Sequence, residues 1–138
     1  MVWENLPSTN TPLNATNLNQ FQEYSTTETV IGKWTDGKPL YRKAYPITIN
    51  HTGSGSTQAY TNNHNLSNVE TIYINRGASY GLVGADRLGA DSLYVDNGTL
   101  GFYMRNEVNT TRIRTDVYYS ANTSINLIII LEYTKTTD

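Results

Sequence analysis

The segment between Ala78 and Leu100 holds one concentrated mixture of aromatic rings, carboxylates and guanidinium groups. Planar rings with polar edges can stack on sugar rings, and neighbouring Asp, Asn and Arg side chains can hydrogen-bond sugar hydroxyls. The candidate saccharide-contacting residues in these predicted loops are Tyr80, Asp86, Arg87, Asp91 and Tyr94. Tyrosine also favours β-strands, so packing within a sheet is the simpler interpretation of any single ring.

The carboxylates of this segment recur at five-residue intervals, at Asp86, Asp91 and Asp96, around a short repeat, Gly-Ala-Asp-x-Leu. Two such carboxylates could serve a glycoside hydrolase, and several could bind calcium if they converged in space. Spacing along the chain establishes neither arrangement. We therefore expect solvated loop carboxylates, with a hydrolase and a calcium site as the alternatives.

Other residue types that carry catalytic or metal chemistry are few. The chain has no cysteine and only two histidines, His51 and His64, which lie in polar sequence without His-x-x-x-His spacing. The Gly-Ser-Gly-Ser run at 53–56 lacks the lysine of a phosphate-binding loop. The sequence predicts no catalytic residue, no metal site and no cofactor. It also predicts surface or turn histidines and a loose, mobile connection over residues 51–65.

Charge and length argue against several classes of protein. Ten basic and twelve acidic residues give a formal net charge of −2 and a pI near 5.6 over 138 residues, with no Lys/Arg block to neutralise a row of phosphates. The longest purely aliphatic run, Leu127–Leu131, has five residues, whereas a membrane-spanning helix needs about 20. We therefore expect no nucleic-acid binding and no membrane insertion.

Two regions differ in their patterning. Residues 1–23 are polar and show no sustained period, which predicts a linker or an extended N-terminal arm. Residues 24–138 alternate apolar and polar positions between turn signals. The clearest element is a hairpin that joins residues 29–34 to 40–45 through Asp36-Gly37. Further strands are expected at 69–75, 78–83, 92–95, 99–105, 110–119 and 125–133.

About eight short strands with Asn/Gly-rich turns predict an all-β domain over 24–138, a β-sandwich of jelly-roll or related Greek-key type. The last strand is apolar on both faces, because Ile128 and Ile130 alternate with Ile125, Leu127 and Ile129. A sandwich core covers one face only. We expect a neighbouring subunit to cover the other, with Ile128 and Ile130 as candidate residues of an oligomer interface.

Three stretches carry a resemblance: residues 24–43, 64–70 and 131–137. They resemble the C-terminal modules of bacteriophage tail-fibre and receptor-binding structural proteins. The pattern Ile-Gly-Lys-Trp-x-Asp-Gly-Lys-Pro-Leu-Tyr at 31–41 is the most specific part. After His64 this chain has Asn65, where the related modules more often carry glycine.

The resemblance implies a β-sandwich at the distal end of a trimeric fibre of the virion, joined to an upstream shaft. Such a module is non-enzymatic and attaches the virion to a bacterial surface polysaccharide. Two alternatives remain open: a structural trimerisation or capping module that ends the fibre, and a small glycan depolymerase that uses Asp86, Asp91 and Asp96.

Overall fold

The computed structural model describes residues 24–96 and 98–138, and within these ranges all regular structure is β. The predicted arm over 1–23 lies outside the described residues, as does Asn97, which is between the strands expected at 92–95 and 99–105. In the described part there is no helix of the length and apolarity required to cross a membrane.

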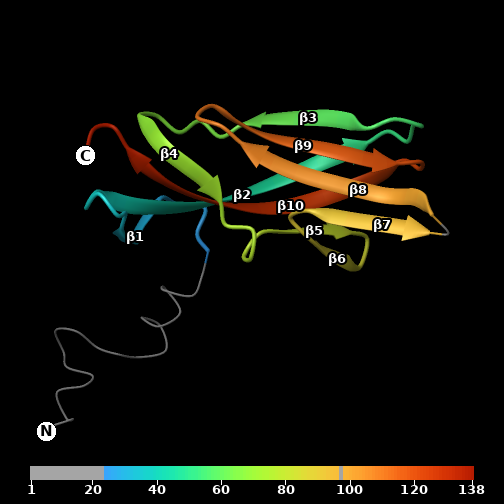
Figure 1. Cartoon of the computed structure of the whole chain (residues 1–138), viewed down its shortest axis with the longest axis horizontal. Helices are drawn as coiled ribbons and strands as arrows, with labels where there is room; N and C mark the ends of the chain where they lie inside the picture. The colour runs from blue at the N-terminus through green and yellow to red at the C-terminus, as the bar shows by residue number, and fades with distance from the viewer. Residues whose placement is uncertain (1–23, 97) are drawn as a thin grey trace, which may run out of the picture.

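The described residues form ten strands in two antiparallel sheets, so the all-β prediction is confirmed. The first sheet has the order β1 (Thr29–Lys33), β2 (Pro39–His51), β10 (Thr123–Lys135), β5 (Tyr80–Val83) and β6 (Asp86–Gly89), and β4 (Val69–Ile74) also pairs with β10. The second sheet has the order β3 (Gln58–Asn63), β9 (Arg112–Tyr119), β8 (Thr99–Val108) and β7 (Ser92–Asp96). β1 and β4 lie at one end of the molecule, and β5, β6 and β7 at the other (Figure 1).

Alternating side chains from the two sheets meet in one hydrophobic core. The first sheet contributes mainly β2 and β10, and the second sheet contributes β8 and β9. The fully buried members are Met104, Ile113, Val117, Ile125, Leu127, Ile129, Leu131 and Tyr133. Arg112 and Arg114, which alternate with the buried residues of β9, are exposed. The period of two therefore assigns one face of each sheet to the core.

The predicted hairpin over 29–45 is confirmed as β1 and β2. Gly37 adopts a φ of 87° in its turn, a conformation that glycine reaches without a steric penalty. The Asp36 carboxylate accepts a hydrogen bond from the backbone N–H of Lys38 at 2.9 Å, and Trp34 N–H donates to the Lys38 carbonyl at 2.8 Å. Asn65 adopts a φ of 59°, so asparagine occupies the left-handed conformation for which glycine is the commoner residue.

The prediction of a loose connection over 51–65 is wrong, because β3 forms within it and pairs with β9. Gly53 also packs tightly: a Cβ atom there would lie 2.3 Å from the carbonyl oxygen of Ser120. The backbone N–H of Gly53 donates to Asn122 Oδ1 at 2.7 Å. A second strand that was not predicted, β6, replaces the expected loop at residues 86–89.

β10 has the predicted alternation, with Ile125, Leu127 and Ile129 in the core. On its opposite face, however, Ile130 is fully buried within the single chain, while Ile128 is half-buried. Ile130 pairs with Ala44 of β2 on one flank, and on the other flank its backbone bonds to the connection between β4 and β5. Of the two candidate interface residues, Ile130 therefore needs no neighbouring subunit to cover it, and only Ile128 is partly exposed.

The face of the first sheet that lies away from the core contains a buried carboxylate, Glu132. Glu132 is 5% exposed and accepts hydrogen bonds from Arg42 Nε at 2.8 Å, Tyr73 OH at 2.6 Å and Asn75 Nδ2 at 3.0 Å. Arg42, Glu132 and Tyr73 are directly opposite one another on β2, β10 and β4. Burial by itself raises the pKa of Glu132. The hydrogen bonds from Tyr73, Asn75 and Arg42, with the Arg42 charge, outweigh it and leave the pKa below the ordinary value.

Candidate functional site

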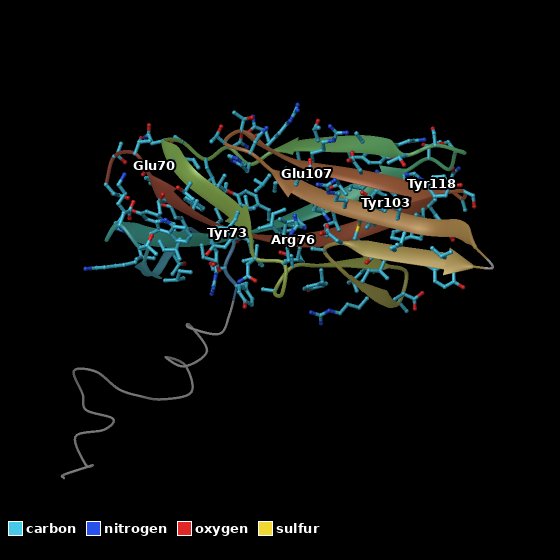
Figure 2. The ribbon with its side chains drawn as sticks, viewed as in Figure 1. Glu70, Tyr73, Arg76, Tyr103, Glu107 and Tyr118 are labelled. Carbon is cyan, nitrogen blue, oxygen red and sulfur yellow. The ribbon has the colours of Figure 1, made fainter. Side chains whose placement is uncertain are left out.

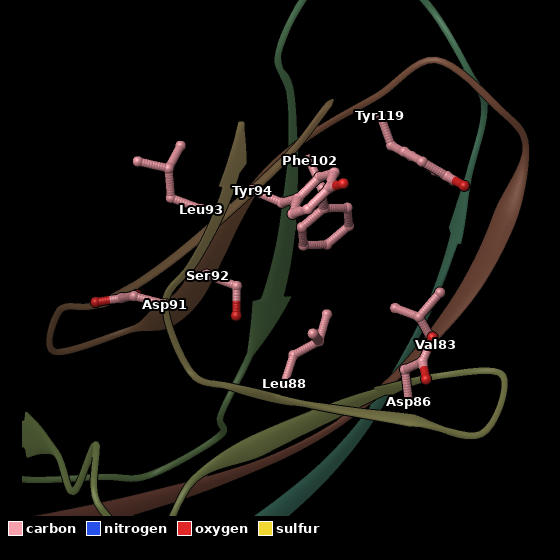
Figure 3. A pocket seen from close by; sticks show the side chains of 9 residues that line it. All are labelled: Val83, Asp86, Leu88, Asp91, Ser92, Leu93, Tyr94, Phe102 and Tyr119. Carbon is pink, nitrogen blue, oxygen red and sulfur yellow. The ribbon is translucent and has the colours of Figure 1, made fainter. Parts of the chain in front are cut away.

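A cleft of about 550 Å³ opens where the β5–β6 hairpin of the first sheet faces β7, β8 and β9 of the second (Figure 3). The lining residues are Val83, Asp86, Leu88, Asp91, Ser92, Leu93, Tyr94, Phe102 and Tyr119. Three of the five residues predicted for saccharide contact are among them: Asp86, Asp91 and Tyr94.

Aromatic rings form much of the cleft wall. Phe102 is nearly buried and meets Tyr119 edge to face, with ring centroids 5.7 Å apart. Tyr94 is 61% exposed and pairs with Phe102 across β7 and β8. Its ring lies against Gly101, where an added Cβ would come within 2.9 Å of Tyr94 Cδ1. Because residue 101 has no side chain, the exposed Tyr94 ring can pack directly against the backbone of β8.

The two carboxylates of the cleft have different surroundings. Asp86 is exposed at the tip of the β5–β6 hairpin, where it pairs with Val83 across the two strands. Asp91 uses both of its oxygens in bonds to the protein: Oδ2 lies 2.6 Å from Arg76 Nη1, and Oδ1 accepts the backbone N–H of Asn106 at 2.9 Å. Asp86 is thus the carboxylate of the pair that is available to a ligand.

Asn106 explains why Asp91 is held in this way. β7 pairs with β8 only as far as Met104, so the edge of β8 beyond Met104 has no strand beside it. Asp91 binds the N–H of Asn106, and Arg76 Nη2 binds its carbonyl oxygen at 2.8 Å. The side chain of Asn106, fully buried, bonds to the Ala90 carbonyl and to Thr115 Oγ1. We call Arg76, Asp91 and Asn106 the edge clamp.

Tyr80 and Arg87, the other two predicted site residues, lie on the opposite face of the first sheet. Gly81 points into the core, since a Cβ there would meet Leu127 and Met104, and its neighbour Tyr80 therefore points outward. The Arg87 guanidinium stacks on the Tyr80 ring at 4.0 Å from its centroid. Asp86 and Arg87 are adjacent in the sequence, but because β6 is a strand they face opposite sides.

Several cleft residues were not predicted from the sequence. Phe102 and Tyr119 lie in strands that the pattern identified, but their meeting depends on the β8–β9 register, in which they are directly opposite. Leu88 and Val83 come together through the β5–β6 pairing. Alternation within the predicted strands marks Phe102, Tyr119 and Val83 as inward-facing, whereas Leu88 lies in the strand that was not predicted. Only the pairing of strands brings these residues to one cleft.

The prediction of surface or turn histidines is wrong, because His51 is 3% exposed and His64 1% exposed. His64 Nδ1 accepts the N–H of Leu66 at 3.1 Å, so Nε2 carries the proton and donates to the Asn109 carbonyl at 2.9 Å. His51 Nε2 donates to the Tyr119 carbonyl at 2.9 Å. Both rings thus hold structural hydrogen bonds. In the described part of the chain, no three His, Cys, Asp or Glu side chains gather as a metal site would require.

The cleft combines apolar walls, an exposed tyrosine ring and an exposed carboxylate. Such a surface can stack on a sugar ring and accept hydrogen bonds from its hydroxyl groups. Comparisons of this chain with protein-family models, with curated proteins and with solved structures found no match.

Proposed function

We propose that this chain is a non-enzymatic receptor-binding module at the tip of a phage tail fibre, which binds a bacterial surface polysaccharide through the cleft. The proposal takes the two-sheet fold as a β-sandwich of jelly-roll or Greek-key type, assembled as a trimer on an upstream shaft. The assignment to a phage tail fibre is supported by the resemblance of the hairpin pattern at 31–41 to tail-fibre modules. The observation that carries the binding function is that the exposed Tyr94 ring and the exposed Asp86 carboxylate line one cleft of about 550 Å³.

Tyr94 and Asp86 have complementary roles in this proposal. The Tyr94 ring stacks on the apolar face of a sugar, and the Asp86 carboxylate accepts hydrogen bonds from its hydroxyls. Each hydroxyl exchanges bonds to water for similar bonds to protein, so the net gain per contact is small. Three tethered copies act at a high effective concentration, and avidity then exceeds single-site affinity by about 10² to 10⁴.

Adsorption of the fluorescently labelled full-length chain to a panel of bacterial strains tests the proposal. On any strain that is bound, Tyr94→Ala should reduce adsorption at least about tenfold, equivalent to about 1.4 kcal/mol. Tyr80→Ala, verified by light scattering to have the oligomeric state of the wild type, is the matched control. It removes the same ring from the opposite face of the first sheet and should leave adsorption unchanged. Equal losses of adsorption in both variants, or unchanged adsorption of Tyr94→Ala, would show that the cleft is not the binding site.

A capping module is the second candidate, and the edge strand β7 favours it. Leu93 is 68% exposed and Val95 50% exposed on a strand that pairs only with β8. Exposed apolar edges are commonly covered by another chain. A chain that is trimeric yet adsorbs to no strain in the panel would support capping over receptor binding.

The depolymerase alternative requires two available carboxylates in the cleft. Asp91 is engaged on both oxygens by the edge clamp, which disfavours a catalytic role for it. We expect no release of oligosaccharides from a polysaccharide that the chain binds. Time-dependent release of short fragments, lost in Asp86→Asn, would replace the proposal with an enzyme.

A further inference from the structure

The cleft lies between the inward faces of the two sheets, at an end of the molecule where core side chains do not fill the space between them. On the first sheet, Asp86 is directly opposite Val83, which packs against the core. On the second sheet, Tyr94, Phe102 and Tyr119 are opposite one another across β7, β8 and β9, and Phe102 belongs to the core. Residues that are directly opposite in neighbouring strands project on the same side of a sheet. The two walls of the cleft therefore face each other.

The charged groups that line the cleft are all acidic. Two of the nine lining residues, Asp86 and Asp91, are carboxylates, and none is a lysine, an arginine or a histidine. The charge of Asp91 is balanced by Arg76, whose Nη1 lies 2.6 Å from Asp91 Oδ2. Among the described residues, Asp86 forms no ion pair. The cleft thus carries one negative charge that the protein does not balance.

The arginines closest to the cleft in the sequence do not supply a positive charge to it. Arg87 follows Asp86, but alternation along β6 turns it to the opposite face, where its guanidinium stacks on Tyr80 at 4.0 Å from the ring centroid. Arg76, which Figure 2 shows just beyond the end of β4, has both Nη atoms engaged in the edge clamp. An anionic sugar in the cleft would therefore meet a carboxylate and no available cation.

The rings of the cleft add a second preference for positive charge. The face of an aromatic ring carries partial negative charge and attracts a cation placed over it. The Tyr94 ring is 61% exposed, so a ligand can reach it. Leu88 and the buried Phe102 make part of the lining apolar. Apolar surroundings lower the local dielectric and strengthen the attraction between Asp86 and a cation, compared with open water.

We infer that the cleft selects a polysaccharide that carries unacetylated amino sugars. The ammonium group of such a sugar donates charge-assisted hydrogen bonds to the Asp86 carboxylate, and a ring of the same polysaccharide stacks on Tyr94. A hydroxyl group in place of the ammonium keeps a hydrogen bond to Asp86 but loses the charge, and a carboxylate in that place is repelled. The inference rests on the proposed function and specifies the class of polysaccharide.

Calorimetric titration of the full chain with three matched tetrasaccharides tests the inference. The neutral probe is a cello-oligosaccharide, the cationic probe is its glucosamine counterpart, and the anionic probe is its glucuronate counterpart. At about pH 5.5, amines are protonated and carboxylic acids are ionised. Attraction between exposed charges is modest, so we expect the cationic probe to bind about three- to tenfold more tightly than the neutral probe and the anionic probe to bind most weakly. These differences should shrink with added salt.

Two variants locate the source of the preference. Asp86→Asn should abolish the advantage of the cationic probe and leave the affinity for the neutral probe within about twofold. Glu107→Gln is the matched control, because it also removes one negative charge. Glu107 lies along β8 (Figure 2), and strand alternation places it on the opposite face from Phe102 of the cleft. Glu107→Gln should therefore retain the preference, and circular dichroism checks that both variants fold.

Four results would each overturn the inference. These are equal affinity for the cationic and neutral probes, no binding of the cationic probe at millimolar concentration, a preference that survives in Asp86→Asn, and equal losses in Asp86→Asn and Glu107→Gln.

Tyr94→Ala distinguishes failure of the inference from failure of the proposed function. If the cationic and neutral probes bind equally and Tyr94→Ala weakens both, the charge preference is wrong and the cleft remains the binding site. If Tyr94→Ala changes neither the affinity for the probes nor adsorption to cells, the cleft is not the binding site and the proposed function fails as well.

Discussion

Arg76 and Asp91 bind each other, and each also binds a backbone group of Asn106. Arg76 Nη1 lies 2.6 Å from Asp91 Oδ2, while Nη2 donates to the Asn106 carbonyl and Asp91 Oδ1 accepts the Asn106 N–H. The two side chains thereby supply the hydrogen bonds that an adjacent strand would otherwise make along β8. Asp91 also lines the cleft, so the same contacts hold part of the cleft wall in place.

Asp91→Ala should destabilise the chain by about 1 to 3 kcal/mol, because it leaves the Asn106 N–H without its partner. Urea unfolding of the full chain measures the effect. Arg114→Ala is the control: it breaks the Arg114–Asp116 pair at 2.8 Å on an exposed sheet face and should leave the unfolding midpoint within error. Loss of stability in Arg114→Ala equal to that in Asp91→Ala would mean that the edge clamp has no special role.

Tyr45 and Tyr133 should respond in opposite ways to removal of the hydroxyl group. The Tyr45 hydroxyl is buried with no hydrogen-bond partner among the described residues, and burial raises its pKa to about 12. The Tyr133 hydroxyl donates to Glu28, which also pairs with Lys135 at 2.5 Å. Tyr45→Phe should therefore be neutral or stabilising by up to about 1 kcal/mol, and Tyr133→Phe destabilising by about 1 to 2 kcal/mol. Thermal unfolding of both variants checks the order, and a reversal of it would contradict the assigned partners.

Glu132 should make the stability of the chain depend on acid. Its pKa in the folded state lies below the ordinary value of 4.5, so its contribution is complete above pH 4.5 and declines as the pH falls through the lower, folded-state pKa. Glu132→Gln should cost about 2 kcal/mol at pH 7, since Arg42 loses its charged partner. The difference from the wild type should shrink in acid. A constant difference in the free energy of unfolding between pH 7 and pH 3 would refute this assignment.

Ile128 and Ile130 offer a paired test of the proposed trimer. Ile130 is fully buried inside the chain, so Ile130→Lys should unfold or severely destabilise it, by more than about 3 kcal/mol. Ile128 is half-buried beside Tyr80, and Ile128→Lys should dissociate the trimer while the monomer stays folded. Light scattering and circular dichroism measure the two properties. A wild-type chain that is monomeric at micromolar concentration would reject the trimer.

Chelation should have little effect on folding. The described residues contain no group of three or more potential metal ligands. We expect the melting temperature in EDTA to match that in buffer within about 5 °C, a shift that corresponds to roughly one kcal/mol for a domain of this size. A larger decrease, reversed by adding calcium, would identify a structural ion.

Local pattern was sufficient to predict the β1–β2 hairpin and the two faces of β9 and β10, because turn chemistry and period-two alternation act over a few residues. It was insufficient for Asp91, whose partners are 15 residues away in both directions, at Arg76 and Asn106. Tyr80 was grouped with Tyr94 because they are close in sequence. Their separation depends on the register that turns Gly81 toward Leu127 of β10. A one-residue change of register would exchange the two faces.

Sequence also could not predict the burial of Ile130. The alternation of β10 correctly placed Ile128 and Ile130 on one face, and it implied that both needed an external cover. Ser79, from the connection between β4 and β5, donates its hydroxyl to the backbone N–H of Ile130 at 2.8 Å. That contact joins residues 51 positions apart, and no periodic signal marks the connection as the element that lies along β10.

The place of β10 in the first sheet has a consequence for how the chain folds. β10 is the last strand in the sequence, yet it pairs with β2, β4 and β5, so its partners begin as early as residue 39. The first sheet cannot form until residues 123–135 have left the ribosome, because β10 lies at its centre. Until then β2, β4 and β5 lack their common partner, and their apolar side chains stay exposed. Such long-range closure is slow and exposes the waiting strands to aggregation. Expression at reduced temperature, or with a chaperone that shields β2, should therefore raise the yield of folded chain more than any change at the cleft.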